Sequence, residues 1–315
     1  MKKFVQAGRN ILLPLLVNIL VMVMLGVLFQ AALHFFPGLQ RHANLLWVLG
    51  AISLVLGMGG AFVSLLASRW VAKQFGGVQV VDPDTNHPEL RELVRMVHGY
   101  AQRAGLPAMP EVGIYDSPEV NAFATGPGRS SSLVAVSTGL LRQMNRAEAE
   151  GVIAHEVAHI ANGDMVTMTL VQGVLNAFVF FFAHVLGFLA AQALRGRSDD
   201  RERGGFGDYL IQSLLINLFQ FLFGLLAMIV VCWFSRRREF RADAGSMLLA
   251  GKDRMISALR ALQRIQGQPV NVAEAGGNFG FEALKISGHP SGFLALLSTH
   301  PPLEERIAHL ESLGR

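Results

Sequence analysis

Cysteine is almost absent from this chain of 315 residues, since Cys232 is the single one. A disulfide framework within the chain and a four-cysteine zinc module are therefore both excluded. Charge is scarce too: charged residues make up 16% of the chain and hydrophobic ones 51%. With a mean hydropathy of +0.39, this composition indicates that much of the chain is dissolved in lipid. The net charge of +4 comes without a basic stripe of interleaved aromatics, so nucleic-acid binding is not predicted.

Four windows contain no Asp, Glu, Lys or Arg: residues 10–40, 42–68, 165–194 and 209–235. Each exceeds the roughly 20 residues that a helix needs to cross a hydrocarbon core. Because backbone groups in lipid must be satisfied within their own segment, we predict four transmembrane helices, at about 11–36, 44–68, 165–194 and 209–235. The alternative, a buried core helix, rarely runs on for so long. A signal peptide would be shorter than the first window and would be followed by a cleavage site.

The predicted spans divide the chain into four parts. Two membrane hairpins, 1–68 and 165–235, alternate with two polar stretches, 69–164 and 236–315, which can form one soluble domain. Basic residues flank the spans on one side: Lys2, Lys3, Arg9, Arg69, Lys73, Arg236, Arg237 and Arg238. By the positive-inside rule, both termini and the soluble domain are predicted to be cytoplasmic. Four arginines in the turn between the third and fourth spans oppose this orientation, but the initial hairpin usually dominates.

The first polar stretch carries signals for both helices and strands. Apolar residues recur at helical spacing in 86–106, with Gly105 as a stop signal. A short strand is predicted in 111–117, and a hairpin from the runs 121–124 and 133–137. The predicted fold is thus a mostly α membrane protein with a small β element. That element either serves the structure alone or offers an edge strand to which an extended peptide can pair.

The segment "AEGVIAHEVAHIANGD" follows the hairpin. Asn145 and Glu148 predict a capping box for a helix that covers at least 146–160. His155 and His159 then lie one turn apart on one face, as two ligands of a single metal ion require. The alternative is a pair of solvated helix histidines, because this motif should arise by chance in roughly 1% of such sequences.

The remaining parts of a zinc site can be found around this motif. Glu156 lies about 100° around the helix from His155 and can accept a proton from water without being a ligand. A catalytic zinc usually has three protein ligands, and "SRRREFRADAGS" follows the last span. There Glu239 can complete the site, and Asp243, four residues on, can orient a ligand histidine. Two spans return the chain to its starting side, so Glu239 and the histidines emerge from the same membrane face.

The motifs "HEVAHIANGD", "EFRADAGS", "NAFATG" and "THPPLEERI" resemble those of the HtpX-type membrane zinc metalloproteases of peptidase family M48, relatives of the CAAX prenyl proteases. The resemblance covers nearly the whole chain, with the motifs in the family's order. It implies a cytoplasmic, gluzincin-like protease domain with one Zn²⁺ per chain. The implied ligands are His155, His159 and Glu239, with Glu156 as general base.

The resemblance also assigns substrate contacts. It implies that Asn121 contacts the substrate backbone, that His300 donates to the developing oxyanion, and that Arg306 takes part in substrate binding. For His300 and Arg306 the alternative is an ordinary turn followed by a helix cap.

The expected function is a zinc endopeptidase of a bacterial inner membrane. Its expected partners are the lipid bilayer and polypeptides, chiefly misfolded or damaged membrane proteins cut at the cytoplasmic face. A CAAX-type processing protease is an alternative, although seven or more spans would be expected there. A membrane protein that binds zinc without catalysis is another. The oligomeric state is not predicted.

Overall fold

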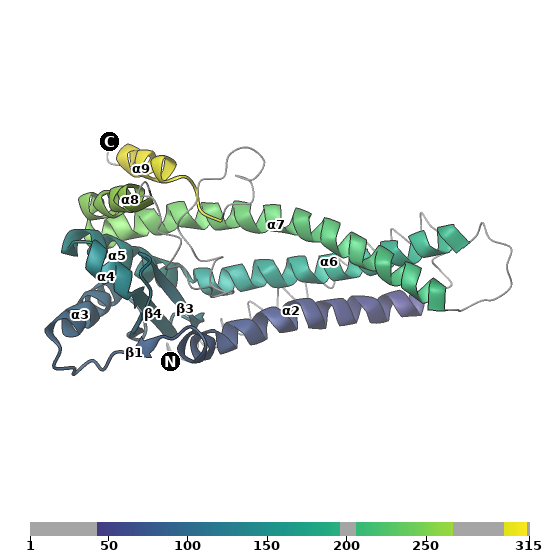
Figure 1. Ribbon diagram of the computed structural model, residues 1–315, viewed down its shortest axis with the longest axis horizontal. Coiled ribbons are helices and arrows are strands. Elements are labelled where there is room, and N and C mark those ends of the chain that lie inside the picture. Colours follow the sequence, from purple (N-terminus) through teal and green to yellow (C-terminus); the bar gives the residue numbers. More distant parts are fainter. Residues whose placement is uncertain (1–42, 196–205, 267–298, 314–315) are drawn as a thin grey trace. The chain divides into compact units, whose positions relative to one another are not determined.

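The computed structural model describes residues 43–195, 206–266 and 299–313 (Figure 1). Its helices are α2 (Ala43–Gln74), α3 (Pro88–Arg103), α4 (Thr138–Gln143), α5 (Arg146–Asn162), α6 (Asp164–Arg195), α7 (Phe206–Ala250), α8 (Lys252–Gln266) and α9 (Leu303–Ser312). Its strands are β1 (Gln79–Val80), β2 (Glu111–Tyr115), β3 (Ala122–Gly128) and β4 (Ser131–Ser137). The described residues fall into two compact units. The span unit comes from the described residues within Met1–Val63 and Thr169–Val230, and the site unit from those within Ser64–Met168 and Val231–Arg315.

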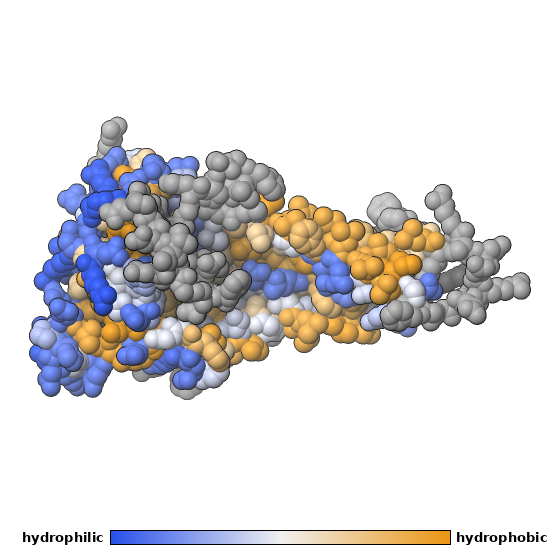
Figure 2. Space-filling model, in the orientation of Figure 1, coloured by the Kyte–Doolittle hydropathy of each residue, from blue (hydrophilic) through white to orange (hydrophobic). Residues whose placement is uncertain are grey.

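Three of the described helices are long and apolar enough to cross a membrane: Leu46–Gln74, Asp164–Leu194 and Gly207–Ala250. They overlap the last three predicted windows, whereas the predicted span at about 11–36 lies outside the described residues. Figure 2 shows hydrophobic residues gathered on the surface of these helices. The most apolar part of α7 is not buried by any of the described residues, which is what a lipid-facing helix requires.

Small residues allow α2 and α6 to approach closely in the span unit. A Cβ atom on Gly57 of α2 would lie 2.7 Å from the Cα of Ala177 on α6. One on Gly173 of α6 would lie 2.7 Å from the sulfur of Met58. Ala177 itself is fully buried. Close backbone approach at small residues is a usual way for membrane helices to associate.

The site unit contains a four-stranded sheet in the order β1-β2-β4-β3. The predicted hairpin is present as antiparallel β3 and β4, and the predicted strand is β2, parallel to β4. Strand β1 was not predicted. Because β4 lies in the middle, its residues Leu133 to Val136 are fully buried. Strand β3 lies at the edge, with one side unpaired within the described sheet.

One hydrophobic core joins this sheet to the helices around it. It contains Val97 of α3, Val134 of β4, Ile153 of α5, Leu259 of α8 and Leu310 of α9. Helix α3 matches the helix predicted in 86–106, and Gly105 follows it with a positive φ of 64°. Helix α5 therefore packs between the sheet and α8, which fixes the helix that carries the histidine motif.

The ends of two helices determine where the site residues lie. Helix α5 ends at Asn162, where Gly163 adopts a left-handed φ of 72°, and α6 begins at Asp164. The Asn-Gly stop therefore separates α5 from the third predicted span. Helix α7 instead continues without a break from its apolar part through Glu239 and Asp243 to Ala250.

Candidate metal centre

The local sequence of α5 explains the placement of both histidines. The Asn145 side chain accepts a hydrogen bond from the Glu148 backbone N–H at 3.1 Å, and the Glu148 carboxylate accepts one from the Asn145 N–H at 3.0 Å. This is the predicted capping box. His155 and His159 follow on one face of the helix, and both are buried.

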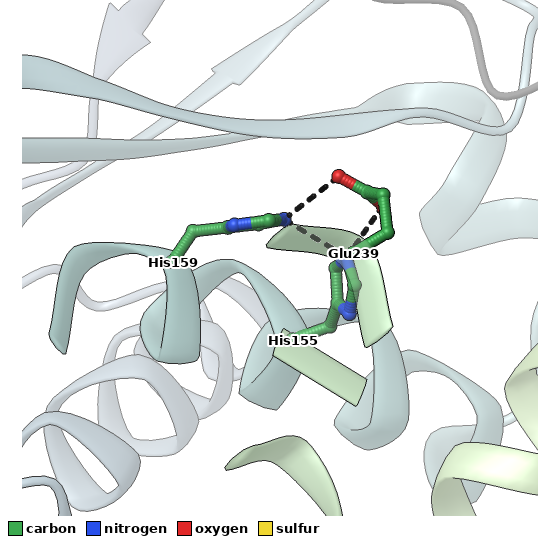
Figure 3. Close-up of side chains that lie close together, drawn as sticks. All are labelled: His155, His159 and Glu239. Atoms are coloured by element: carbon green, nitrogen blue, oxygen red, sulfur yellow. Dashed lines mark hydrogen bonds and ion pairs between the residues drawn. The ribbon is translucent and has the colours of Figure 1, made fainter. Parts of the chain in front are cut away.

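Glu239 approaches these histidines from α7 (Figure 3). The Nε2 atoms of His155 and His159 lie 3.1 Å apart. Each lies 3.3 Å from a carboxylate oxygen of Glu239. Four ligands at about 2.0–2.2 Å around a tetrahedral Zn²⁺ lie roughly 3.3 Å from one another. The two Nε2 atoms therefore have the spacing of two corners of a zinc tetrahedron. The two distances to Glu239 join different carboxylate oxygens, and one ligand atom of each side chain lies within 4.8 Å of the others.

The remaining polar atoms of the cluster also fit a metal. His155 Nδ1 lies 3.0 Å from Asp243 Oδ1, and His159 Nδ1 lies 2.6 Å from Asp164 Oδ2. A neutral imidazole that donates from Nδ1 presents a lone pair at Nε2, so two lone pairs point to the centre of the cluster once both rings have lost their extra proton. Both Glu239 oxygens are buried, and each lies 3.3 Å from one of these Nε2 atoms. The residues present therefore fit a bound Zn²⁺ through their Nε2 and carboxylate atoms.

The electrostatics of the centre favour a cation. Burial alone would lower the pKa of His159, but the carboxylates of Glu239 and Asp164 raise it to about 9. Burial alone would raise the pKa of Glu239, yet the imidazoles of His159 and His155 hold it well below its usual range. The cluster thus attracts positive charge, and a metal that binds there has to displace a proton.

Asp243 is held in turn by Arg306. The side chain of Arg306 is 2% exposed and donates two hydrogen bonds to Asp243, of 2.6 Å to Oδ1 and 2.8 Å to Oδ2. Burial would raise the pKa of Asp243, but Arg306 lowers it to about 2. The guanidinium that was predicted to bind substrate is therefore engaged with Asp243, and its substrate contact stays a prediction.

A cavity of about 220 Å³ opens beside the cluster. Glu156 and His300 line it together with the histidines, and His300 Nδ1 lies 3.0 Å from Glu239 Oε2. Residues 122–124 of the edge strand β3 form another wall. Asn121 does not line this cavity but directly precedes β3, and its side-chain oxygen is buried without a hydrogen-bond partner in the described part of the chain.

Sequence reasoning missed two residues of the centre. Asp164 contacts His159 as described above, and Arg241 donates a hydrogen bond of 2.7 Å to its other oxygen. An acidic residue directly after a helix stop and directly before a charge-free window was the available signal for Asp164.

Comparisons with known proteins point in one direction. The family model described as "Peptidase family M48" matches residues 88–313. The chain is 49% identical to a "Protease HtpX homolog" of Methylacidiphilum infernorum, covering 97% of this chain and 99% of that one. It is 45% identical to "Protease HtpX" of Escherichia coli, covering 96% and 98%. Its fold is similar to the crystal structure of S. mikatae Ste24p, with a TM-score of 0.54 and 18% identity over 98% of this chain and 64% of that one.

Proposed function

Since this chain belongs to peptidase family M48 and is a membrane metalloprotease, we propose that it is an endopeptidase whose His155, His159 and Glu239 hold one zinc ion per chain. The observation that carries this proposal is the spacing of 3.1, 3.3 and 3.3 Å among the three buried side chains. Three protein ligands leave a fourth tetrahedral position open, as catalytic zinc sites do.

The chemistry divides among the residues around the cavity. Zinc, when bound, supplies a Lewis acid for the scissile carbonyl and for water. Glu156, beside His155 on α5, accepts the proton of the attacking water and delivers it to the leaving amine. Asp243, held by Arg306, keeps the imidazole of His155 oriented.

Substrate contacts come from the edge of the sheet and from His300. An extended peptide pairs with the unpaired side of β3, next to residues 122–124 that line the cavity. Asn121, at the start of this edge, donates to or accepts from the peptide backbone. His300 donates to the developing oxyanion, and Arg306, which also lines the cavity, takes part in substrate binding.

We further propose a bacterial inner-membrane protein with four spans and both termini and the active site in the cytoplasm. The parts are an N-terminal hairpin (1–68), a second hairpin (165–235), and one protease domain made of 69–164 and 236–315. Basic residues at the span ends support this orientation. One of them is Arg237, whose guanidinium lies 4.7 Å from the ring centre of Trp233, near the end of the fourth predicted span. Glu239 lies on α7, the helix that also forms the fourth predicted span. A site so close to the membrane suits misfolded or damaged membrane proteins as substrates.

The orientation can be tested by cysteine labelling in intact cells. Cys232, the only cysteine, is replaced by Ser, and a single new cysteine is introduced by Asn86→Cys or by Ser198→Cys. A membrane-impermeant maleimide should label Ser198→Cys in intact spheroplasts and Asn86→Cys only after lysis. The reverse pattern would contradict a cytoplasmic protease domain.

The zinc endopeptidase itself is tested on the purified full-length chain in detergent. We expect one zinc per chain, cleavage of unfolded casein, loss of cleavage with phenanthroline, and recovery when zinc is added back. A protein that cleaves a prenylated C-terminal peptide but not casein would instead be a CAAX-type processing protease. Casein cleavage by zinc-free protein would contradict the proposal.

A further inference from the structure

Asp164 lies directly behind His159, on the ring nitrogen that faces away from Glu239. Its Oδ2 atom is 2.6 Å from His159 Nδ1, and its side chain is 1% exposed. Its Oδ1 atom accepts the hydrogen bond of 2.7 Å from Arg241 on α7. Both oxygens of a buried carboxylate are thus satisfied, which offsets the cost of burying its charge.

The backbone explains how Asp164 reaches this place. His159 and Asp164 are five residues apart, a spacing that does not put two side chains on one face of a continuous helix. The left-handed turn at Gly163 ends α5, and Asp164 then begins α6. The carboxylate that contacts His159 therefore belongs to the first residue of α6, directly before the third predicted span.

The other histidine has the same arrangement behind it. His155 Nδ1 contacts Asp243, which Arg306 holds by two hydrogen bonds. Behind each histidine, a carboxylate therefore contacts Nδ1, and a guanidinium donates a hydrogen bond to that carboxylate. The two sets differ in exposure: the Arg306 side chain is 2% exposed, whereas that of Arg241 is 55% exposed.

We propose that Asp164, held by Arg241, is the positioning residue that fixes His159 as a metal ligand. A carboxylate on Nδ1–H fixes the tautomer and the ring orientation and makes Nε2 a better donor to a metal. The inference rests on the proposed zinc site and adds a dependence of zinc affinity on the first residue of α6 and on an exposed arginine of α7.

Zinc affinity of the full-length chain, measured by competition with a chromogenic chelator in detergent, tests this role. Removing such a partner typically costs about 10- to 100-fold in metal affinity, and we expect this loss for Asp164→Asn. Arg241→Gln should lower the affinity by a smaller factor, and Arg241→Lys, which keeps the charge, should lie closer to the wild type. Arg237→Gln, on the same helix but outside the site, is the matched control.

Two further measurements separate positioning from a general effect on folding. Arg241→Gln removes one partner of the buried Asp164 carboxylate, so zinc affinities are compared well below the thermal midpoint of each metal-free protein, and the visible spectrum of the Co²⁺-loaded protein should change in Asp164→Asn. Wild-type affinity in Asp164→Asn would overturn the inference. If that variant does not fold, Arg241→Gln decides: reduced affinity supports the role and unchanged affinity overturns it. A wild-type protein that binds no zinc would instead refute the proposed function.

Discussion

At the scale of single residues, Arg306 is the one whose loss should cost the most stability. Replacing it with Met leaves Asp243, which is 0% exposed, as an uncompensated buried charge. Breaking a buried pair in this way typically costs about 3–5 kcal/mol. We expect Arg306→Met to lower the thermal unfolding midpoint strongly, and the added change Asp243→Leu to recover part of the loss, since no unpaired charge then remains.

A surface arginine provides the control for this prediction. Arg260 pairs with Glu311 at 3.3 Å, with side chains 64% and 54% exposed. Exposed pairs contribute about 0–1 kcal/mol, so Arg260→Met should leave the midpoint almost unchanged. Equal effects of Arg306→Met and Arg260→Met would show that the Asp243 pair does not hold the site together.

The sequence predicts some residues of the centre but not others, for a physical reason. His155 and His159, and likewise Glu239 and Asp243, are four residues apart, so helical periodicity alone brings each pair onto one face. Arg306 lies far along the chain from Asp243, and no local pattern joins the two. Asp164 reaches His159 only because the helix breaks at Gly163, a change of direction that periodicity does not describe.

At the scale of secondary-structure elements, the contact between α2 and α6 predicts unequal effects for neighbouring glycines. A Cβ on Gly57 would press on the backbone of Ala177, whereas one on Gly60 would meet no atom of the described residues within 4 Å. We expect Gly57→Ala to lower the thermal midpoint of the protein in detergent. Gly60→Ala should be neutral or slightly stabilising, because Ala favours a helix by about 1 kcal/mol over Gly. Equal midpoints for the two variants would contradict this packing.

The end of α2 is attached to the sheet by charge. Glu111 of β2 pairs with Arg69, and with Lys73 at 2.6 Å. Burial would raise the pKa of Glu111, but these two cations lower it below its usual 4.5. A carboxyl whose pKa is depressed by folding stabilises the protein above its unfolded-state pKa and loses this contribution as pH falls through the folded value.

Glu111→Gln tests this attachment. The variant should unfold at a lower temperature than the wild type at pH 7, and the difference should shrink as the pH falls below about 4.5. Midpoints compared across this range, with zinc kept constant, measure it. A difference that is constant with pH would mean that the ion pairs are not the cause.

Element boundaries show where sequence reasoning loses accuracy. The absence of charge places the end of the last span at Ser235, yet α7 continues to Ala250, because a helix does not have to end where the lipid does. Helix α8 and strand β1 were not predicted. The two residues of β1 are defined only by their pairing with β2, and pairing partners cannot be read from so short a run.

At the scale of the whole molecule, the metal centre draws on residues from widely separated parts of the chain. The histidines come from α5, Asp164 from the start of α6, Glu239 and Asp243 from α7, and Arg306 from α9. Counting spans predicted that α5 and α7 emerge on the same side of the membrane. It did not predict that α9 lies at the site, because no further span follows the last one and fixes the position of this short helix.

The central claim is that His155, His159 and Glu239 hold zinc while Glu156 handles the proton. Zinc content and casein cleavage of Glu156→Gln, measured beside the wild type, test it most directly. We expect one zinc per chain in both proteins and a loss of cleavage of at least about 100-fold in the variant, since general base catalysis typically contributes that much. Glu150→Gln, on the same helix and paired with Arg254, should cleave normally. A Glu156→Gln protein that is free of contaminating protease and cleaves at the wild-type rate would contradict the account.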